Sequence, residues 1–195
     1  MSTKSPGTST SVEAILEATR QVIANRGPAR FTLSAIAEAA GVSRPTLYRW
    51  FPSKAALLDA LSDYEEKRFE VRLEAVIAAQ STPARRLDAA LRFLVTYLDG
   101  LMGPDPVGAE PAFALQQLAS SLGPQTGSFV RLLGPAFDLV PAVRQGRLSR
   151  EQAAEMFLRV AFSHYLLPHA DTEVLLANLR GFAGLSRRSL TRAAG

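Results

Sequence analysis

A glycine followed closely by a helix-capping serine divides one short stretch of this chain into two helices. In GVSRPTLYRWF, residues 41–51, Gly41 ends the preceding apolar segment and Ser43 stands where a helix N-cap is expected. Pro45 falls in the first turn of the second helix, where its missing N–H costs little. The connector AGVS has the right length for a helix-turn-helix. This turn restricts the possible folds more than any other feature of the sequence.

Apolar residues recur three and four positions apart along the chain, and the sequence shows no alternating strand patterns. This periodicity predicts an all-α protein of about nine helices. The expected helices cover residues 11–26, 33–40, 44–51, 54–79, 84–102, 112–122, 128–145, 150–167 and 171–186. Thr10 and Glu13 form a capping-box pattern at the first helix, and Ser149 is expected to cap the eighth. Prolines at 135 and 141 are expected to interrupt the seventh.

The composition excludes several classes of protein. The chain has no cysteine, which rules out disulfides, thiol catalysis and cysteine-based metal sites. Hydrophobic residues make up 47% of it, enough for a buried core, but its apolar runs are too short to span a membrane. The first ten residues lack the apolar segment of a signal peptide. We therefore expect a disordered N-terminal lead and a cytoplasmic protein.

The helix over residues 44–51 has two chemically different faces. Leu47 and Phe51 lie four residues apart and are expected to pack on the two preceding helices. The opposite face is polar and basic. A helix-turn-helix needs this division, because one face holds the helices together while the other enters the major groove of DNA. Residues 1–52 also carry six lysines and arginines against three glutamates, which suits a polyanionic partner, although a solvated surface would explain the same counts.

Eight residues are candidates for DNA contact: Thr32, Ser43, Arg44, Pro45, Thr46, Tyr48, Arg49 and Lys54. Arginine suits guanine O6 and N7 and the threonine methyl suits thymine, whereas hydroxyls and lysine suit phosphate oxygens. Structural alternatives stay open, because Thr32 and Ser43 would cap helices in any case. Tyr48 could cover the side of the bundle, and Lys54 could be a solvated charge. Trp50 is interpreted as structural, between this helix and the next.

Residues 11–61 resemble the DNA-binding domain of the TetR family of bacterial transcriptional regulators. The family pattern is a helix ending in glycine, then T-x-x-x-I-A-x-x-A-G-V-S, then x-x-x-L-Y-x-x-F-x-x-K-x-x-L. The sequence from Thr32 to Leu57 meets every one of these positions. Trp50 is a minor departure, since histidine or tyrosine is commoner there.

The resemblance implies a repressor-type protein with a helix-turn-helix domain and a C-terminal effector-binding and dimerisation bundle. It is expected to be a homodimer that places two recognition helices on a roughly palindromic double-stranded DNA operator, with half-sites about 34–36 Å apart. A small-molecule effector would release the DNA by changing the spacing of the two heads. The expected domains are a disordered lead (1–10), a helix-turn-helix domain (11–53), an effector and dimerisation domain (54–186) and a flexible basic tail (187–195).

An effector pocket is expected among the fifth to eighth helices. It would be mostly apolar and suit a hydrophobic or amphipathic ligand, although the same aromatic residues could form an ordinary core. The candidate lining residues are Phe93, Tyr97, Met102, Phe113, Gln116, Gln117, Phe129, Phe137, Met156 and Phe162.

Dimerisation is expected to use the last two helices, two from each subunit, in a four-helix interface. The alternative is that one apolar stripe faces the pocket and the other faces the partner. The candidate interface residues are Phe157, Val160, His164, Leu167, Val174, Leu175, Leu179 and Phe182.

The sequence predicts no catalysis, no cofactor and no metal site. His164 and His169 are the only histidines, and their spacing of five places them on different helix faces. No Gly-rich phosphate loop or nucleophile elbow appears in the sequence. Three hypotheses remain: a ligand-responsive repressor, which we favour, a ligand-independent regulator with a filled core, and a helical ligand-binding protein with a vestigial DNA-binding head.

Overall fold

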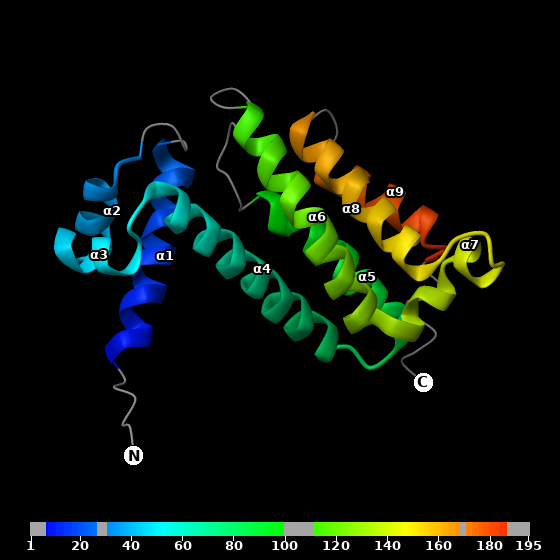
Figure 1. Ribbon diagram of the computed structural model, residues 1–195. Helices are drawn as coiled ribbons and strands as arrows, with labels where there is room; N and C mark the ends of the chain where they lie inside the picture. The colour runs from blue at the N-terminus through cyan, green and yellow to red at the C-terminus, as the bar shows by residue number, and fades with distance from the viewer. Residues whose placement is uncertain (1–6, 27–30, 100–110, 168–170, 187–195) are drawn as a thin grey trace, which may run out of the picture.

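The computed structural model describes residues 7–26, 31–99, 111–167 and 171–186. Over these residues the chain is helical and contains no strand, which confirms the predicted all-α fold. Nine α-helices and one 3-10 helix are described (Figure 1). They are α1 (Gly7–Arg26), α2 (Leu33–Ala39), α3 (Arg44–Trp50), α4 (Lys54–Ala78), α5 (Pro83–Asp99), α6 (Pro111–Leu133), η1 (Gly134–Leu139), α7 (Pro141–Arg144), α8 (Arg150–Leu166) and α9 (Thr172–Phe182).

Helices α1 to α3 form a small head with its own core. Ile15 of α1, Ile36 of α2 and Leu47 of α3 are fully buried together. Gly41 has a φ of +66°, a left-handed conformation that glycine adopts without steric cost. In this turn the amide of Val42 donates to the carbonyl oxygen of Ala37 at 2.9 Å, which closes α2. The glycine therefore reverses the chain as the sequence predicted.

Helix α4 belongs to two cores. Its first turns bury Leu57 and Leu61 in the head, and its later turns bury Phe69 and Leu73 in the C-terminal bundle. Figure 1 shows α4 running from the head to the bundle as one continuous helix. The same helix is therefore packed in both domains. The predicted domain boundary at residue 54 therefore falls before a helix that the two domains share.

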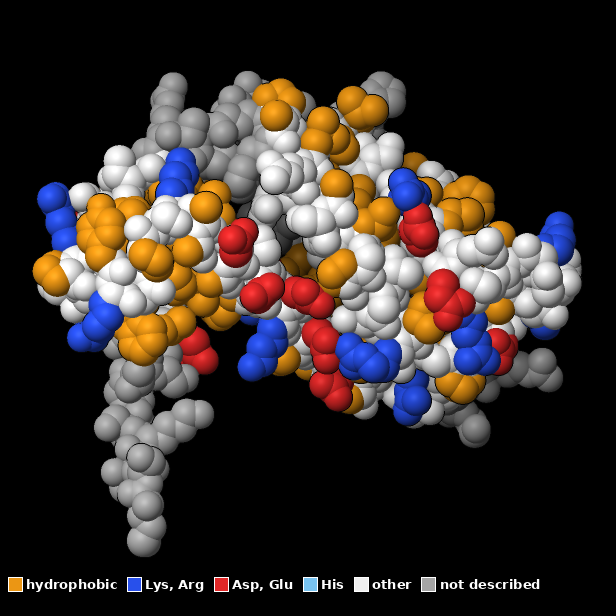
Figure 2. All heavy atoms as spheres, in the orientation of Figure 1, with side chains coloured by type: hydrophobic (Ala, Val, Ile, Leu, Met, Phe, Trp, Pro, Cys, Tyr) orange, Lys and Arg blue, Asp and Glu red, His pale blue; other side chains and the backbone are white. Residues whose placement is uncertain are grey.

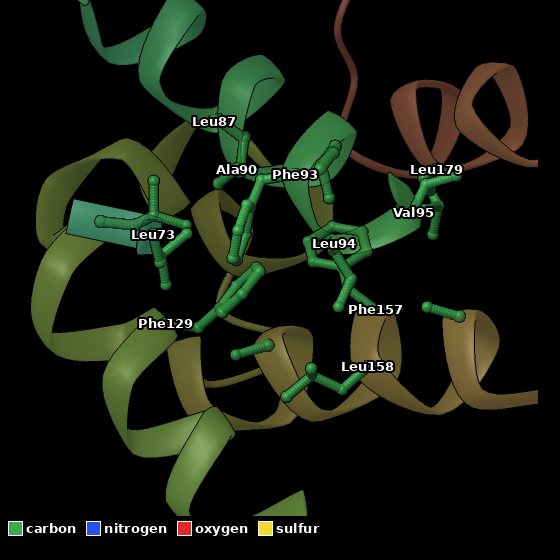
Figure 3. Close-up of a cluster of buried hydrophobic side chains, with 14 of the residues drawn as sticks. Leu73, Leu87, Ala90, Phe93, Leu94, Val95, Phe129, Phe157, Leu158 and Leu179 are labelled. Carbon is green, nitrogen blue, oxygen red and sulfur yellow. The ribbon is translucent and has the colours of Figure 1, made fainter. Parts of the chain in front are cut away.

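The core of the C-terminal bundle contains a group of packed aromatic rings. The ring centroid of Phe69 lies 5.4 Å from that of Phe93, 5.1 Å from that of Tyr97 and 5.9 Å from that of Phe129. Figure 3 shows Phe93 and Phe129 beside Leu73 and Leu94 in this core. Aromatic pairs at such distances each add roughly 0.5–1.5 kcal/mol beyond the area they bury.

Helix α6 differs from its predicted form. We expected two helices, over residues 112–122 and 128–145, but α6 runs unbroken to Leu133 with Pro124 inside it. The predicted gap between residues 122 and 128 is wrong because Leu118 and Phe129, on either side of Pro124, are both buried in the same core, whereas the predicted interruptions at Pro135 and Pro141 are confirmed. Burial of both segments offsets the hydrogen bond that the proline cannot donate. The break occurs later, where the chain enters η1 at Gly134.

Other helix starts agree with the sequence, although α9 ends at Phe182 and not at the predicted residue 186. Ser149 caps α8 in a full capping box with Gln152, and Asp171 caps α9. Helix α1 is an exception, since it begins at Gly7, inside the lead predicted over residues 1–10. The rest of that lead and the predicted tail over residues 187–195 lie outside the described residues.

Candidate DNA-binding surface and effector cavity

Helix α3 presents a polar face to solvent. Leu47 is fully buried, whereas Arg44, Pro45 and Arg49 are exposed and Tyr48 is 49% exposed. Ser43 caps the helix, because its hydroxyl accepts a hydrogen bond from the Thr46 amide at 3.2 Å. The Ser43 and Thr46 hydroxyls also lie 2.8 Å apart. The division between a packed face and a free face is the one that the sequence predicts.

The two remaining DNA-contact candidates lie on neighbouring elements of the head. Thr32 is exposed and caps α2, accepting from the Ala35 amide at 3.1 Å. Lys54 begins α4, is exposed, and places its Nζ 4.0 Å from the ring centroid of Phe31. The structure thus holds all eight candidates on α3 or on the first residues of α2 and α4. Seven are exposed and Thr46 is partly buried.

A cluster of charged side chains joins the head to the bundle. Glu17 of α1 contacts Arg20 at 2.6 Å and Arg68 of α4 at 3.1 Å. Arg68 also lies 3.4 Å from Glu65, whose carboxylate accepts a hydrogen bond from the Tyr97 hydroxyl of α5 at 3.2 Å. These contacts connect α1, α4 and α5.

The cluster changes the protonation of its members. The hydrogen bond from Arg20 lowers the pKa of Glu17 from 4.5 to about 2, against the effect of burial. Burial raises the pKa of Glu65, although Arg68 and the Tyr97 hydroxyl act in the opposite direction. Burial also raises the pKa of Tyr97, with repulsion from Glu65 contributing. The charges at this junction are therefore held by specific contacts, and a change in them affects both domains.

A cavity of about 310 Å³ lies beside this cluster, between the head and the bundle. Figure 2 shows a hollow in this region with acidic side chains along its edge. Helices α1, α4, α5 and α6 line the cavity, and among the lining residues are Arg20, Leu61, Glu65, Tyr97, Gln117 and Gln125. Its volume is at the lower end of the range typical of small-molecule sites.

Only two of the predicted pocket residues, Tyr97 and Gln117, line this cavity. Four others do not, because they are buried in the C-terminal core: Phe93, Phe129, Phe137 and Phe162. Gln116 is exposed on α6 and Met156 lines a shallow depression on α8. Met102 and the side chain of Phe113 lie outside what the structure describes. The sequence analysis missed Arg20, Glu65 and Gln125, whose charge and polarity gave no apolar signal.

The predicted dimer surface is divided between core and exterior. Phe157, Leu175 and Leu179 are buried within the subunit's own core, so their prediction as interface residues is wrong. The apolar periodicity of α8 and α9 did not distinguish the face that packs on α5 and α6 from the opposite face. Leu167 is 74%, Val174 50% and Phe182 56% exposed, and Val160 and His164 are partly buried.

Two tests of the described residues gave negative results. No group of three or more histidine, cysteine, aspartate or glutamate side chains among them could hold a metal ion. In the same part of the chain, no helix has the length and apolar character needed to cross a membrane.

Comparison with known families identifies the head. Residues 15–61 match the bacterial regulatory proteins of the tetR family, over the segment that contains the helix-turn-helix. These residues form a tetR-type DNA-binding domain. The matched segment contains α2 and α3, the two helices of the helix-turn-helix.

Curated relatives match less than half of the chain. The nucleoid occlusion factor SlmA of Aliivibrio fischeri is 30% identical over 88 residues, which cover 45% of each chain. The transcriptional repressor KstR of Mycolicibacterium smegmatis is 34% identical over 96 residues, or 49% of this chain and 45% of KstR. The match thus spans less than half the length of these relatives.

Solved structures match over nearly the whole chain. The fatty acid degradation regulator FadR from Bacillus halodurans has a TM-score of 0.60 and 18% identity, covering 96% of this chain and 99% of its own. FadR from Bacillus subtilis in complex with stearoyl-CoA has a TM-score of 0.57 and 19% identity, covering 89% and 99%. At these identities the likeness shows a shared fold.

Proposed function

We propose that the chain is a ligand-responsive repressor that binds a palindromic operator as a homodimer. The observation that carries the proposal is the exposed polar face of α3, held by the buried Leu47. Arg44 and Arg49 would contact bases or phosphates in the major groove, and Thr46 would meet a thymine methyl. Tyr48 and Lys54 would bind phosphate oxygens, as would the hydroxyls of Thr32 and Ser43.

The dimer would form through the outer faces of α8 and α9. Leu167, Val174 and Phe182 are large apolar side chains that are at least half exposed in the single subunit. A two-fold axis beside these helices would bury them against the same residues of a second copy. Two recognition helices would then reach half-sites about 34–36 Å apart.

The cavity supplies a route for regulation. It contacts α1 of the head through Arg20 and the shared helix α4 through Leu61 and Glu65. A ligand that binds better when the heads are wrongly spaced for DNA would lower DNA affinity by that difference in free energy. The alternative is a ligand-independent regulator with a filled core. The bundle core is packed, but the cavity of about 310 Å³ at the junction with the head supplies a place for an effector to bind.

The proposed activity needs no catalysis and no cofactor. It takes place on the bacterial chromosome, so we propose that the protein acts in the cytoplasm. The KstR repressor and the stearoyl-CoA complex of FadR, among the relatives and structural neighbours, support a repressor that responds to a small molecule.

A band-shift titration tests this function. Purified protein is titrated on DNA from upstream of its own gene, against unrelated DNA of equal length at near-physiological salt. We expect specific retardation with two protomers per site, weakening steeply as salt rises because phosphate contacts release counterions. Selective retardation by one protomer would contradict the dimer, and salt-independent binding would contradict the phosphate contacts.

A further inference from the structure

The hydroxyl groups around the cavity are already used as donors. Ser62 donates to the carbonyl oxygen of Leu58 at 3.1 Å, and Ser120 donates to that of Gln117 at 3.0 Å. Ser121 donates to a backbone carbonyl of the same helix at 3.1 Å. A serine hydroxyl has one hydrogen and two lone pairs. All three serines therefore offer the cavity only acceptor capacity.

Tyr97 and Gln125 also present hydrogen-bond acceptors to the cavity. The Tyr97 hydroxyl donates to Glu65, so its own oxygen faces a ligand as an acceptor. Gln125 is only 5% exposed, and its buried Oε1 has no hydrogen-bond partner in the structure. An unpaired buried acceptor destabilises the folded protein, and a donor on a ligand would pair with it. The uncharged donors left on the lining are the side-chain amides of Gln117 and Gln125.

The charged groups of the lining favour a cationic ligand over an anionic one. Asp63, Glu65 and Glu66 line the cavity, and Arg20 is the one cation among the described lining residues. Arg20 is engaged by Glu17 at 2.6 Å and lies 3.9 Å from Glu65. The lining thus has three carboxylates and a single guanidinium that already has a partner, and it carries an excess of negative charge. An anionic ligand would be repelled here, most strongly where water is excluded.

The remaining lining is apolar. Ile23 of α1, Leu61 of α4 and Pro124 of α6 contribute hydrocarbon surface, and Tyr97 contributes a ring. A ligand that fits the cavity therefore needs a compact apolar body as well as hydrogen-bond donors.

We propose that the cavity binds a small organic cation, an apolar body carrying a protonated amine that donates to Glu65, Glu66 or Gln125. The proposal rests on the ligand response proposed above and specifies the class of effector. It distinguishes this chain from FadR with its stearoyl-CoA, since the phosphates of a coenzyme A thioester would meet carboxylates here.

The same position explains how such a ligand would act on the head. An ammonium group at Glu65 competes with Arg20, which lies 3.9 Å from that carboxylate and belongs to α1. It also changes the field at Arg68, which holds Glu17 of α1. Binding would therefore weaken contacts that fix the head against α4.

Isothermal titration calorimetry of the full chain tests the class of ligand. The probes are 1-adamantylamine and 1-adamantanecarboxylate, which have the same apolar cage and opposite charge at pH 7. We expect the amine to bind at least tenfold more tightly than the carboxylate, since a unit charge beside carboxylates is worth more than 1.4 kcal/mol at low effective dielectric. Equal binding, tighter binding of the carboxylate or no binding of either probe would overturn the proposal.

Two variants locate the site. Glu66→Gln removes one carboxylate from the exposed edge of the cavity without touching the Glu17–Arg20–Arg68 contacts, and should weaken amine binding about fivefold. Glu74→Gln removes an exposed carboxylate of the same helix that does not line the cavity, and should leave the amine affinity unchanged. Equal effects of the two substitutions would place the amine elsewhere and overturn the site.

DNA binding is measured separately on the same preparations. Specific operator retention with a preference for the carboxylate would refute the cation proposal and leave the repressor function standing. Preference for the amine without specific DNA retention would support the cation proposal and refute the repressor function.

Discussion

Replacing Glu17 by glutamine tests the junction between the head and the bundle. Glu17 contacts Arg20 at 2.6 Å and Arg68 at 3.1 Å, so it joins α1 to α4. Glutamine keeps the shape of the side chain and removes its charge. Both arginines then lose an anionic partner, and the folded state should lose stability at pH 7.

The pKa of Glu17 sets the size of this loss. A fall from 4.5 to about 2 corresponds to roughly 3.4 kcal/mol, at about 1.36 kcal/mol for each pH unit. The side chain is 34% exposed, so solvent screening reduces this figure. We expect Glu17→Gln to lower the free energy of unfolding by about 1–2 kcal/mol at pH 7.

The direction of the pKa shift determines how the stabilisation by Glu17 changes with pH. Because the pKa of Glu17 is lowered in the folded state, its carboxylate stabilises the fold fully above about pH 4.5, and this stabilisation is lost as the pH falls towards about 2. The difference between wild type and variant should therefore shrink steadily from pH 5 to pH 3.

Urea denaturation followed by far-UV circular dichroism measures this difference, at one fixed protein concentration because the proposed dimerisation would affect apparent stability. Glu13→Gln is the matched control, an exposed glutamate one turn earlier on α1. It should change stability by less than about 0.5 kcal/mol. If the difference in the free energy of unfolding between wild type and Glu17→Gln stays constant between pH 5 and pH 3, the ion-pair explanation is refuted.

Further substitutions test the recognition helix and two glycines, one in a turn and one inside a helix. Tyr48→Phe should weaken binding to operator and unrelated DNA alike. Arg44→Ala should instead relax the preference at one operator position by roughly 1–3 kcal/mol. Competition band shifts on single-base operator variants separate the two effects. Gly184→Ala should destabilise the fold by more than about 1 kcal/mol, because φ is +69° and the added Cβ would lie 2.8 Å from Pro141. Gly127→Ala, inside α6 with nothing within 4 Å of the added Cβ, should stabilise it by about 0.5–1 kcal/mol in thermal denaturation.

The head could be predicted closely because its signals are local. A glycine at 41, serine caps and a four-residue apolar spacing each act within one or two helical turns, so they specify α2 and α3 without knowledge of the rest of the chain. The same holds for Ser149 at the start of α8. Tertiary packing overrode the local signal at Pro124, where burial on both sides kept α6 continuous.

The cavity could not be predicted, because it depends on contacts between distant segments. Tyr97 and Gln125 meet Arg20 and Glu65 only when α5 and α6 pack beside α1 and α4. Most of the aromatic residues predicted to line the pocket lie in the core instead, since an apolar side chain on a helix has the same spacing whether it faces a core or a pocket. Phe93 and Phe129 illustrate this, as both became core residues.

Selection of bound sequences from a pool of random double-stranded DNA tests the central claim most directly, because it requires no knowledge of where the operator lies. A repressor dimer that recognises DNA through α3 should enrich a roughly palindromic site with half-sites about one helical turn apart, and the Arg44→Ala variant should enrich a site degenerate at one position in each half. Failure of the wild-type protein to enrich any sequence over the starting pool would contradict the account.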